Sequence, residues 1–278
     1  MTSIIHNVSA SMFISDYSEF TVLIACVGVG NVSQLACDLL IHNCSFQLAS
    51  NIYFKNIPSV VGSDPFSETS TQKCLATCCQ LYVNKERHLA VLQSRSPPFP
   101  KCRKKHIQEL VHFLSELNCS RIILLSNSYG AQRNDSELTG PQLRYAVAGP
   151  SDSDDIARLE ALNLASLSPQ REQYLVELGL PKPTTTFHLP GGGLAGSLFD
   201  QLASYVTKPV FLLNLFTSEG DNASDAVFVA WTVSQWLGLS KAIGQSGVQP
   251  PESLQTAGWR APASWKMLYG SATVGSLY

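Results

Sequence analysis

The sequence predicts an α/β protein, a three-layer α/β/α sandwich in which helices cover both faces of a mostly parallel or mixed sheet. Two observations predict this fold class. Apolar runs alternate along the chain with segments whose apolar residues recur at helical spacing. The apolar runs are rich in Val, Ile, Leu and Phe, and several are nearly continuous, which is typical of strands buried on both faces.

Five apolar runs are the candidate strands: residues 20–29, 88–93, 121–126, 143–148 and 210–216. Three segments predict helices: residues 33–42, 104–118 and 223–239. In the first two helices the apolar residues fall on one face. In the third they go most of the way round, so we expect that helix to be buried on more than one side. Asn222, with Asp225 three residues later, is typical of a helix N-cap.

The length of 278 residues favours one domain, residues 1–278. The stretch 151–180 is polar, acidic and helical, and it predicts a helical insertion or a lid-like helical pair between strands. Residues 249–252, with two adjacent prolines, read as a linker. The last part of the chain, about residues 271–278, is expected to be a tail.

Composition argues against several function classes. The net charge of −2 implies no strongly basic face, so nucleic acid is not an expected partner. The densest basic cluster (Lys101, Arg103, Lys104 and Lys105) lies at the start of a predicted helix, where it is either solvated or meets an acidic partner. The N-terminus has no signal-peptide pattern, and the longest apolar run is shorter than the ~20 residues that span a bilayer. We therefore expect a soluble, intracellular protein without a membrane partner.

The eight cysteines are expected to be reduced. Cys26, Cys37 and Cys119 lie in apolar contexts and read as small core residues. Cys74, Cys78 and Cys79 lie close together, but no matching distant pair completes a metal-site pattern. The sequence therefore predicts no metal and no cofactor.

The turn after the first strand has the shape of a nucleotide-binding turn. Gly28 and Gly30 are present, but Ser33 stands where a dinucleotide fingerprint has its third small residue. An acidic residue about 20 positions later, which would hold the ribose, is also missing. The alternative is that the glycines allow a sharp turn and the close approach of a neighbouring backbone.

Three later loops have the same ambiguity. Residues 125–138 follow a strand, and their polar side chains either bind a small ligand or satisfy their own backbone. Residues 191–193 are three glycines that open a helix, but the Lys and Ser/Thr of a phosphate-binding loop are absent. Residues 215–226 carry neighbouring acids, which either do acid–base work or cap a helix. The candidate side chains in the first and last of these loops are Ser126, Ser128, Arg133, Asp135, Glu219 and Asp221.

No catalytic set is assembled by these motifs, and the six histidines are not spaced as metal ligands. The enzymatic alternative is a nucleoside- or nucleotide-binding α/β enzyme that uses the Gly28/Gly30 turn and the Glu219/Asp221 loop. The other alternative is a binding role. The low charged share of 14% and the tryptophans of the last third favour a hidden interface. These tryptophans are Trp231, Trp236, Trp259 and Trp265.

Five motifs occur in one order between about residues 20 and 271: VGVGNVSQLACDLLI, SNSYGAQRND, PGGGLAGSLFD, SEGDNASDA and PASWKMLYGS. Together they resemble the proteasome assembly chaperone 2 family. The resemblance implies an α/β/α sandwich distantly like nucleoside phosphorylases and a non-enzymatic role in the cytoplasm and nucleus. It also assigns a structural role to the matching residues, which are Gly28, Gly30, Asn31, Gly191, Gly192, Gly193, Glu219, Gly220, Asp221 and Trp265.

The partners also follow from the resemblance. Members pair with proteasome assembly chaperone 1, and the heterodimer binds α subunits of the 20S core particle, promotes α-ring formation and prevents wrong α-ring dimers. Related proteasome-binding tails end in a hydrophobic residue, a tyrosine and any residue. Here Ser276, Leu277 and Tyr278 are the candidate docking residues, but the tyrosine is last rather than penultimate.

Overall fold

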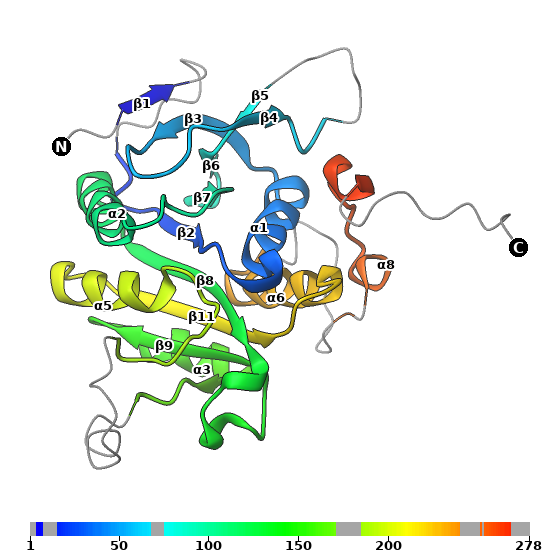
Figure 1. Cartoon of the computed structure of the whole chain (residues 1–278). Coiled ribbons are helices and arrows are strands. Elements are labelled where there is room, and N and C mark those ends of the chain that lie inside the picture. The colour runs from blue at the N-terminus through cyan, green and yellow to red at the C-terminus, as the bar shows by residue number, and fades with distance from the viewer. Residues whose placement is uncertain are drawn as a thin grey trace, which may run out of the picture.

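The computed structural model describes residues 4–7, 16–67, 75–170, 185–239, 251 and 253–267. A nine-stranded mixed sheet forms its middle layer, in the order β1-β3-β6-β7-β2-β8-β11-β9-β10 (Figure 1). The strands of this sheet are Ile4–Asn7 (β1), Thr21–Ala25 (β2), Gln47–Tyr53 (β3), Cys79–Asn84 (β6), Leu89–Ser94 (β7), Arg121–Tyr129 (β8), Leu143–Ala148 (β9), Ala165–Ser166 (β10) and Val210–Thr217 (β11). Val61–Ser63 (β4) and Leu75–Thr77 (β5) pair separately as an antiparallel hairpin.

The centre of the sheet is a parallel block. Strands β7, β2, β8 and β11 pair in parallel, and antiparallel strands β6 and β9 flank them. Every residue of β2 and β11 is buried. Their continuous apolar sequences are those of strands covered on both faces, so the predicted fold class is confirmed.

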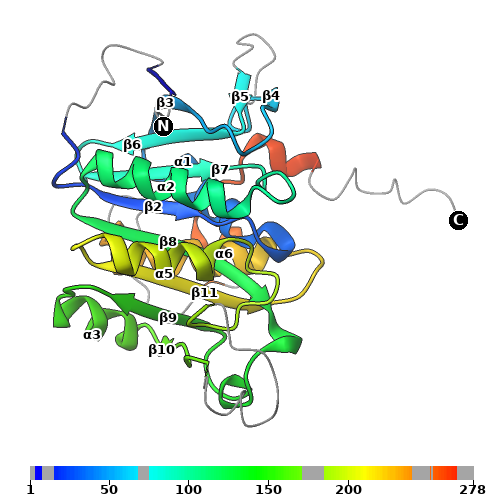
Figure 2. The same cartoon turned by 60° about the vertical axis from the view of Figure 1, so that its left-hand side comes forward.

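Helices cover both faces of the sheet (Figure 2). One face carries α1 (Val32–Asn43), α3 (Ser153–Ala161), α6 (Ala223–Trp236) and α8 (Leu254–Ala257), whereas the other carries α2 (Arg103–Leu117) and α5 (Ala195–Tyr205). Short 3-10 turns are formed by Val29–Asn31 (η2), Gly130–Gln132 (η3), Asp135–Glu137 (η4) and Ala263–Met267 (η5).

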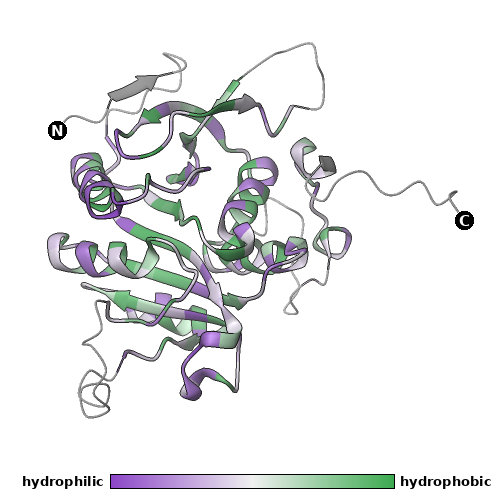
Figure 3. Cartoon of the chain, in the orientation of Figure 1, coloured by the Kyte–Doolittle hydropathy of each residue, from purple (hydrophilic) through white to green (hydrophobic). Residues whose placement is uncertain are grey.

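Alternation along the strands divides the core into two halves. In β2, Val22 and Ile24 pack with α2 and α5, whereas Leu23 and Ala25 pack with α1 and α6. This is the period of two that successive side chains of a strand must have. Figure 3 shows hydrophobic residues concentrated along the central strands and hydrophilic residues over much of α2.

Several boundaries differ from the prediction. The first strand ends at Ala25 rather than at residue 29, because the chain leaves the sheet for the glycine turn. Helix α6 ends at Trp236 rather than at residue 239. Gly238 takes a left-handed conformation directly after the helix, which is typical of a helix C-terminus. Residues 151–170 form α3 and the edge strand β10. The second half of the expected helical pair lies outside the described residues, as do most of the linker and the tail.

Three of the four tryptophans of the last third are buried. Trp231, Trp236 and Trp259 are only 3%, 2% and 5% exposed. The ring of Trp236 meets Phe211 of β11 with centroids 4.9 Å apart. Trp236 and Trp259 belong to the core on the α1 and α6 face of the sheet. Because all three side chains are buried within this chain, they leave little surface for the interface that the sequence favoured.

Cys26, Cys37 and Cys119 are buried, as predicted for small core residues. Within the described ranges, no cluster of three or more His, Cys, Asp or Glu side chains could hold a metal ion. Cys74 lies outside those ranges. None of the described helices combines the length and apolar character needed to cross a membrane.

Candidate functional site

The four glycine-rich and polar motifs of the sequence meet at one edge of the sheet. Strands β2, β8 and β11 are parallel neighbours, so their carboxyl ends lie side by side (Figure 2). The turn before α5 reaches the same edge, where Val29 N donates to Gly191 O at 2.9 Å and Tyr129 N donates to Pro190 O at 2.8 Å. Residues 26–33, 127–133, 190–194 and 217–222 are called the turn cluster below.

Glycines let the backbones of the turn cluster touch. A Cβ on Gly28 would lie 2.9 Å from Asn127 O, and a Cβ on Gly193 would lie 1.9 Å from Val27 O. A Cβ on Gly30 would lie 2.1 Å from Asn222 Nδ2. Gly30 and Gly193 also have positive φ angles of 64° and 57°. The turn is therefore already filled by neighbouring parts of the chain.

Asn127 of β8 joins the turn to the sheet. Its side chain is fully buried, and its Oδ1 accepts from Ser33 N at 3.3 Å and from Ser33 Oγ at 2.8 Å. Its Nδ2 donates to Val29 O. Ser33 N is one of the N–H groups that a helix N-terminus offers to a phosphate. Here a side chain of the same protein takes it.

Asn127 is not among the site residues predicted from the sequence. The sequence feature that points to Asn127 is an amide residue directly after an apolar run, in the segment LLSNSY. A buried polar side chain must find partners, but its sequence position does not say which ones.

Glu219 and Asp221 each bond to a different structural group. Tyr129 OH donates to Glu219 Oε1 at 2.6 Å, and this hydrogen bond is the largest of the causes that raise the pKa of Tyr129. Asp221 Oδ1 accepts from Ala223 N at 3.0 Å, at the start of α6. The carboxylates thus fix the β11–α6 junction rather than facing each other as an acid–base pair.

The predicted N-cap of α6 differs in detail. Asn222 occupies the N-cap position, but its side chain does not cap the helix. Its Nδ2 donates to Gly220 O at 3.1 Å, and its Oδ1 accepts from Thr217 Oγ1 at 2.9 Å. Asn222 is instead used to close the 217–222 turn beneath Gly30.

The polar loop after β8 also bonds internally. Ser126 and Ser128 are buried within β8 itself, and Ser128 Oγ accepts from Asn214 Nδ2 at 2.9 Å. The Arg133 guanidinium donates to Gln142 Oε1 and to Leu138 O and lies 5.8 Å from the centre of the Phe216 ring. Asp135 starts η4. Arg133 thus bonds within the connection between β8 and β9 and Ser128 bonds to β11, whereas Ser126 Oγ is buried without a hydrogen-bond partner among the described residues.

A second surface lies at the β4–β5 hairpin. Val61 pairs with Thr77 and Ser63 pairs with Leu75, so all four side chains share one face. Val61 is 61% exposed and Leu75 is 65% exposed. We call this the hairpin face. These side chains are available for contact with another protein.

Trp265 lies beside the hairpin. It belongs to η5 and is half-buried against the core of α1 and α6. The neighbouring Ser264 N donates to Pro65 O at 3.0 Å, which ties η5 to the segment after β4. The three predicted docking residues, Ser276, Leu277 and Tyr278, lie outside the described residues.

The model of the PAC2 family matches residues 22–199, more than half of the chain. The chain belongs to the PAC2 family. This match spans the first three parts of the turn cluster.

Curated relatives extend the similarity over nearly the whole chain. The chain is 29% identical to Proteasome assembly chaperone 2 of Danio rerio, over 95% of this chain and 96% of the relative. It is 28% identical to the protein of that name from Homo sapiens, over 95% and 96%. For the Xenopus tropicalis protein the identity is 31%, over 94% and 95%.

Solved structures share the fold. Pyrococcus furiosus PbaA, described as an archaeal homolog of proteasome-assembly chaperone, aligns with a TM-score of 0.58 and 16% identity over 89% of each chain. Pyrococcus furiosus PbaB, described as an archaeal proteasome activator, aligns with a TM-score of 0.55 and 15% identity over 86% of this chain and 92% of PbaB.

Proposed function

We propose that this protein is a chaperone subunit that pairs with proteasome assembly chaperone 1. The pair promotes assembly of the 20S proteasome α-ring and prevents off-pathway α-ring dimers, in the cytoplasm and nucleus. The observation that carries the proposal is the similarity to relatives named Proteasome assembly chaperone 2 over about 95% of both chains.

Three structural features support a binding role over a nucleotide-processing one. The N-terminus of α1 and the Gly28/Gly30 turn are occupied by Asn127, Asn222 and the 190–194 turn. The Glu219 and Asp221 carboxylates are bonded to Tyr129 and to the start of α6. The hairpin face meanwhile exposes apolar side chains that a protein partner would bury.

For the chain terminus we propose a docking role. Ser276, Leu277 and Tyr278 would enter a pocket between α subunits, where the terminal carboxylate is captured. Tail docking and partner pairing are separable, because the first depends on residues 274–278 and the second on the folded domain.

The deciding experiment is a mild pull-down of tagged full-length chain, read by mass spectrometry. We expect one α/β-sandwich partner and 20S α subunits. A chain that lacks residues 274–278 should keep the partner and lose the α subunits, whereas a chain with five residues of unrelated sequence in their place controls for length. Recovery of neither protein, from cells that express both, contradicts the proposal, and recovery of only further copies indicates a homodimeric scaffold.

Thermal unfolding separates the chaperone from the enzyme. The partner should raise the melting temperature, because anything that binds only the folded state stabilises it. Nucleosides, phosphate and NAD should leave it unchanged. If the small ligands raise the melting temperature and the partner does not, the enzymatic alternative at the Gly28/Gly30 turn is favoured.

A further inference from the structure

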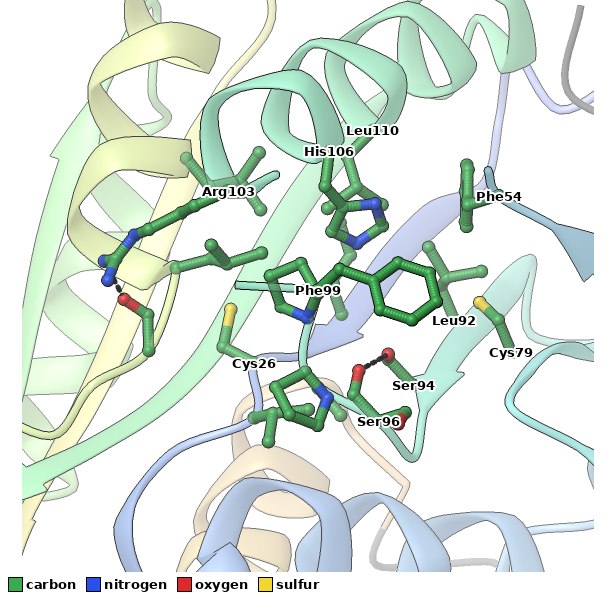
Figure 4. Close-up of a pocket in the computed structure, with 18 of the residues that line it drawn as sticks. Cys26, Phe54, Cys79, Leu92, Ser94, Ser96, Phe99, Arg103, His106 and Leu110 are labelled. Atoms are coloured by element: carbon green, nitrogen blue, oxygen red, sulfur yellow. Dashed lines mark hydrogen bonds between the residues drawn. The ribbon is translucent and has the colours of Figure 1, made fainter. Parts of the chain in front are cut away.

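A cavity of about 310 Å³ lies next to the turn cluster, on the other side of the end of β2. Its walls come from β2, β6, β7, α2 and α5 and from residues 26–27 and 193–194 of the turn cluster, and the proline-rich loop 96–101 also lines it (Figure 4). Figure 4 shows the Phe99 ring among the lining side chains, with Arg103 to one side and Cys79 to the other. Drug-sized ligands occupy pockets that start at about this volume, roughly 300 Å³.

The position of the cavity is the one where open α/β sheets bind ligands. After β2 the chain passes to α1 on one face of the sheet, and after β7 it passes to α2 on the other face. β2 and β7 are parallel neighbours, so the two connections diverge at their carboxyl ends. Such a divergence leaves a crevice at a topological switch point.

The inside of the cavity is apolar and uncharged at neutral pH. Ile24, Leu92 and Leu198 contribute aliphatic walls. Burial raises the pKa of the Cys26 thiol to about 12. Burial also lowers the pKa of His106, and the hydrogen bond with Glu109 opposes this only in part. The thiol and the imidazole therefore line the cavity in their neutral forms.

The mouth of the cavity is cationic. Lys101 and Arg103 belong to its lining and are both exposed. The Arg103 guanidinium donates to Gly193 O, which holds it against the turn cluster and leaves other N–H groups of its five for a ligand. The first turn of α2 contains no acidic residue, so the helix dipole adds to the positive field.

We propose that this cavity binds a small amphipathic carboxylate, with its apolar body inside and its carboxylate at Lys101 and Arg103. The site goes beyond the assembly function, because none of the hairpin-face residues lines it. Bound ligand would tie loop 96–101 to β2, α2 and α5.

Calorimetric titration of the full-length chain with decanoate tests the proposal. Decanol and decylamine have the same apolar body and serve as neutral and cationic probes. We expect saturable decanoate binding that is about tenfold tighter than decanol binding, because the carboxylate makes one charge-assisted contact. Decylamine should bind more weakly than decanol. Equal affinity for decanoate and decanol, or no saturable binding of decanoate, overturns the proposal.

Matched charge variants locate the carboxylate. Lys101→Gln with Arg103→Gln should remove the preference for decanoate over decanol. Lys104→Gln with Lys105→Gln removes the same amount of charge from the adjacent first turn of α2, but these residues do not line the cavity. An equal loss in both double variants would show a general electrostatic effect and would contradict the site.

The apolar half of the site has its own test. Ser96→Trp places a large ring in the lining and should abolish decanoate binding. Methyl NMR on the unaltered chain gives an independent reading that needs no variant. Decanoate should shift the methyl signals of Leu110 and Leu198 and leave Leu159, which packs on the opposite face of the sheet. Shifts at Leu159 alone would overturn the assignment.

Discussion

The end of β2 separates two regions with opposite packing. On one side, Gly28 lies so close to Asn127 that a Cβ would meet a carbonyl oxygen at 2.9 Å. On the other side, Cys26 and Val27 line a cavity of about 310 Å³. The glycine motif that resembles a ligand site is thus filled by the chain itself, whereas the space for a ligand lies beside ordinary apolar residues.

Gly193→Ala, where the turn cluster borders the cavity, should have the largest effect. Its Cβ would lie 1.9 Å from Val27 O, and the residue has a φ of +57° that alanine rarely adopts. We expect a loss of about 3–5 kcal/mol in the free energy of unfolding, because backbone on both sides must move. Chemical denaturation measures it.

Gly62→Ala is the matched control. Gly62 lies in β4, and a Cβ there would have no neighbour within 4 Å. The free energy of unfolding should change by less than about 0.5 kcal/mol. Similar losses at Gly62 and Gly193 would mean that close packing does not explain the glycine.

Asn127→Ala should have the next largest effect. It leaves Val29 O and Ser33 without the partners that the buried amide supplies. A loss of about 2–3 kcal/mol is expected for buried polar groups left unpaired. Asn134→Ala, at a half-buried amide with one long hydrogen bond to Ser168 O, should cost less than about 1 kcal/mol. A loss below about 1 kcal/mol at Asn127 would show that water replaces its bonds.

The sequence predicts the parallel centre of the fold well. Strands β2, β7, β8 and β11 are continuous apolar runs, and that pattern follows from burial on both faces. Strands β3 and β6 are missed because polar residues interrupt them. Gln80 is buried in β6 and donates to Asn51 Oδ1 of β3 at 3.0 Å. That bond depends on strand register, which a single segment does not reveal.

The turn cluster and the cavity also differ in how far the sequence predicts them. Parallel strand order brings the motif-bearing loops to one edge, so their convergence follows from the predicted fold. The cavity does not follow, because its lining comes from β2, β6, β7, α2 and α5, from the turn cluster and from the loop 96–101. A cavity forms where the side chains of several elements leave space between them. No local sequence pattern predicts such a space.

The pH dependence of stability probes the cavity side. Burial lowers the pKa of His106 from its ordinary value of 6.5, despite the hydrogen bond with Glu109. As pH falls through 6.5, the unfolded chain takes up a proton before the folded chain does. The stability that neutral His106 contributes is therefore complete above pH 6.5 and decreases below it.

Denaturation curves at several pH values check this prediction. His106→Gln should reduce the decrease in the free energy of unfolding below pH 6.5. The variant also loses the ring contact with Phe54, which changes the free energy of unfolding at every pH but not its dependence on pH. An unaltered slope in His106→Gln would mean that the imidazole is not the group that titrates.

Ser96→Trp should have the smallest effect and sharpens the comparison most. Ser96 lines the cavity from the loop over it, so an indole ring can enter existing space. Burial of the ring stabilises the folded state and offsets the cost of adjusting the loop, so we expect a change of less than about 1 kcal/mol in either direction. A single added carbon at Gly193 should thus cost more than a whole added ring at Ser96. If equilibrium denaturation reverses that order, the space beside β2 is closed in solution and cannot admit a ligand.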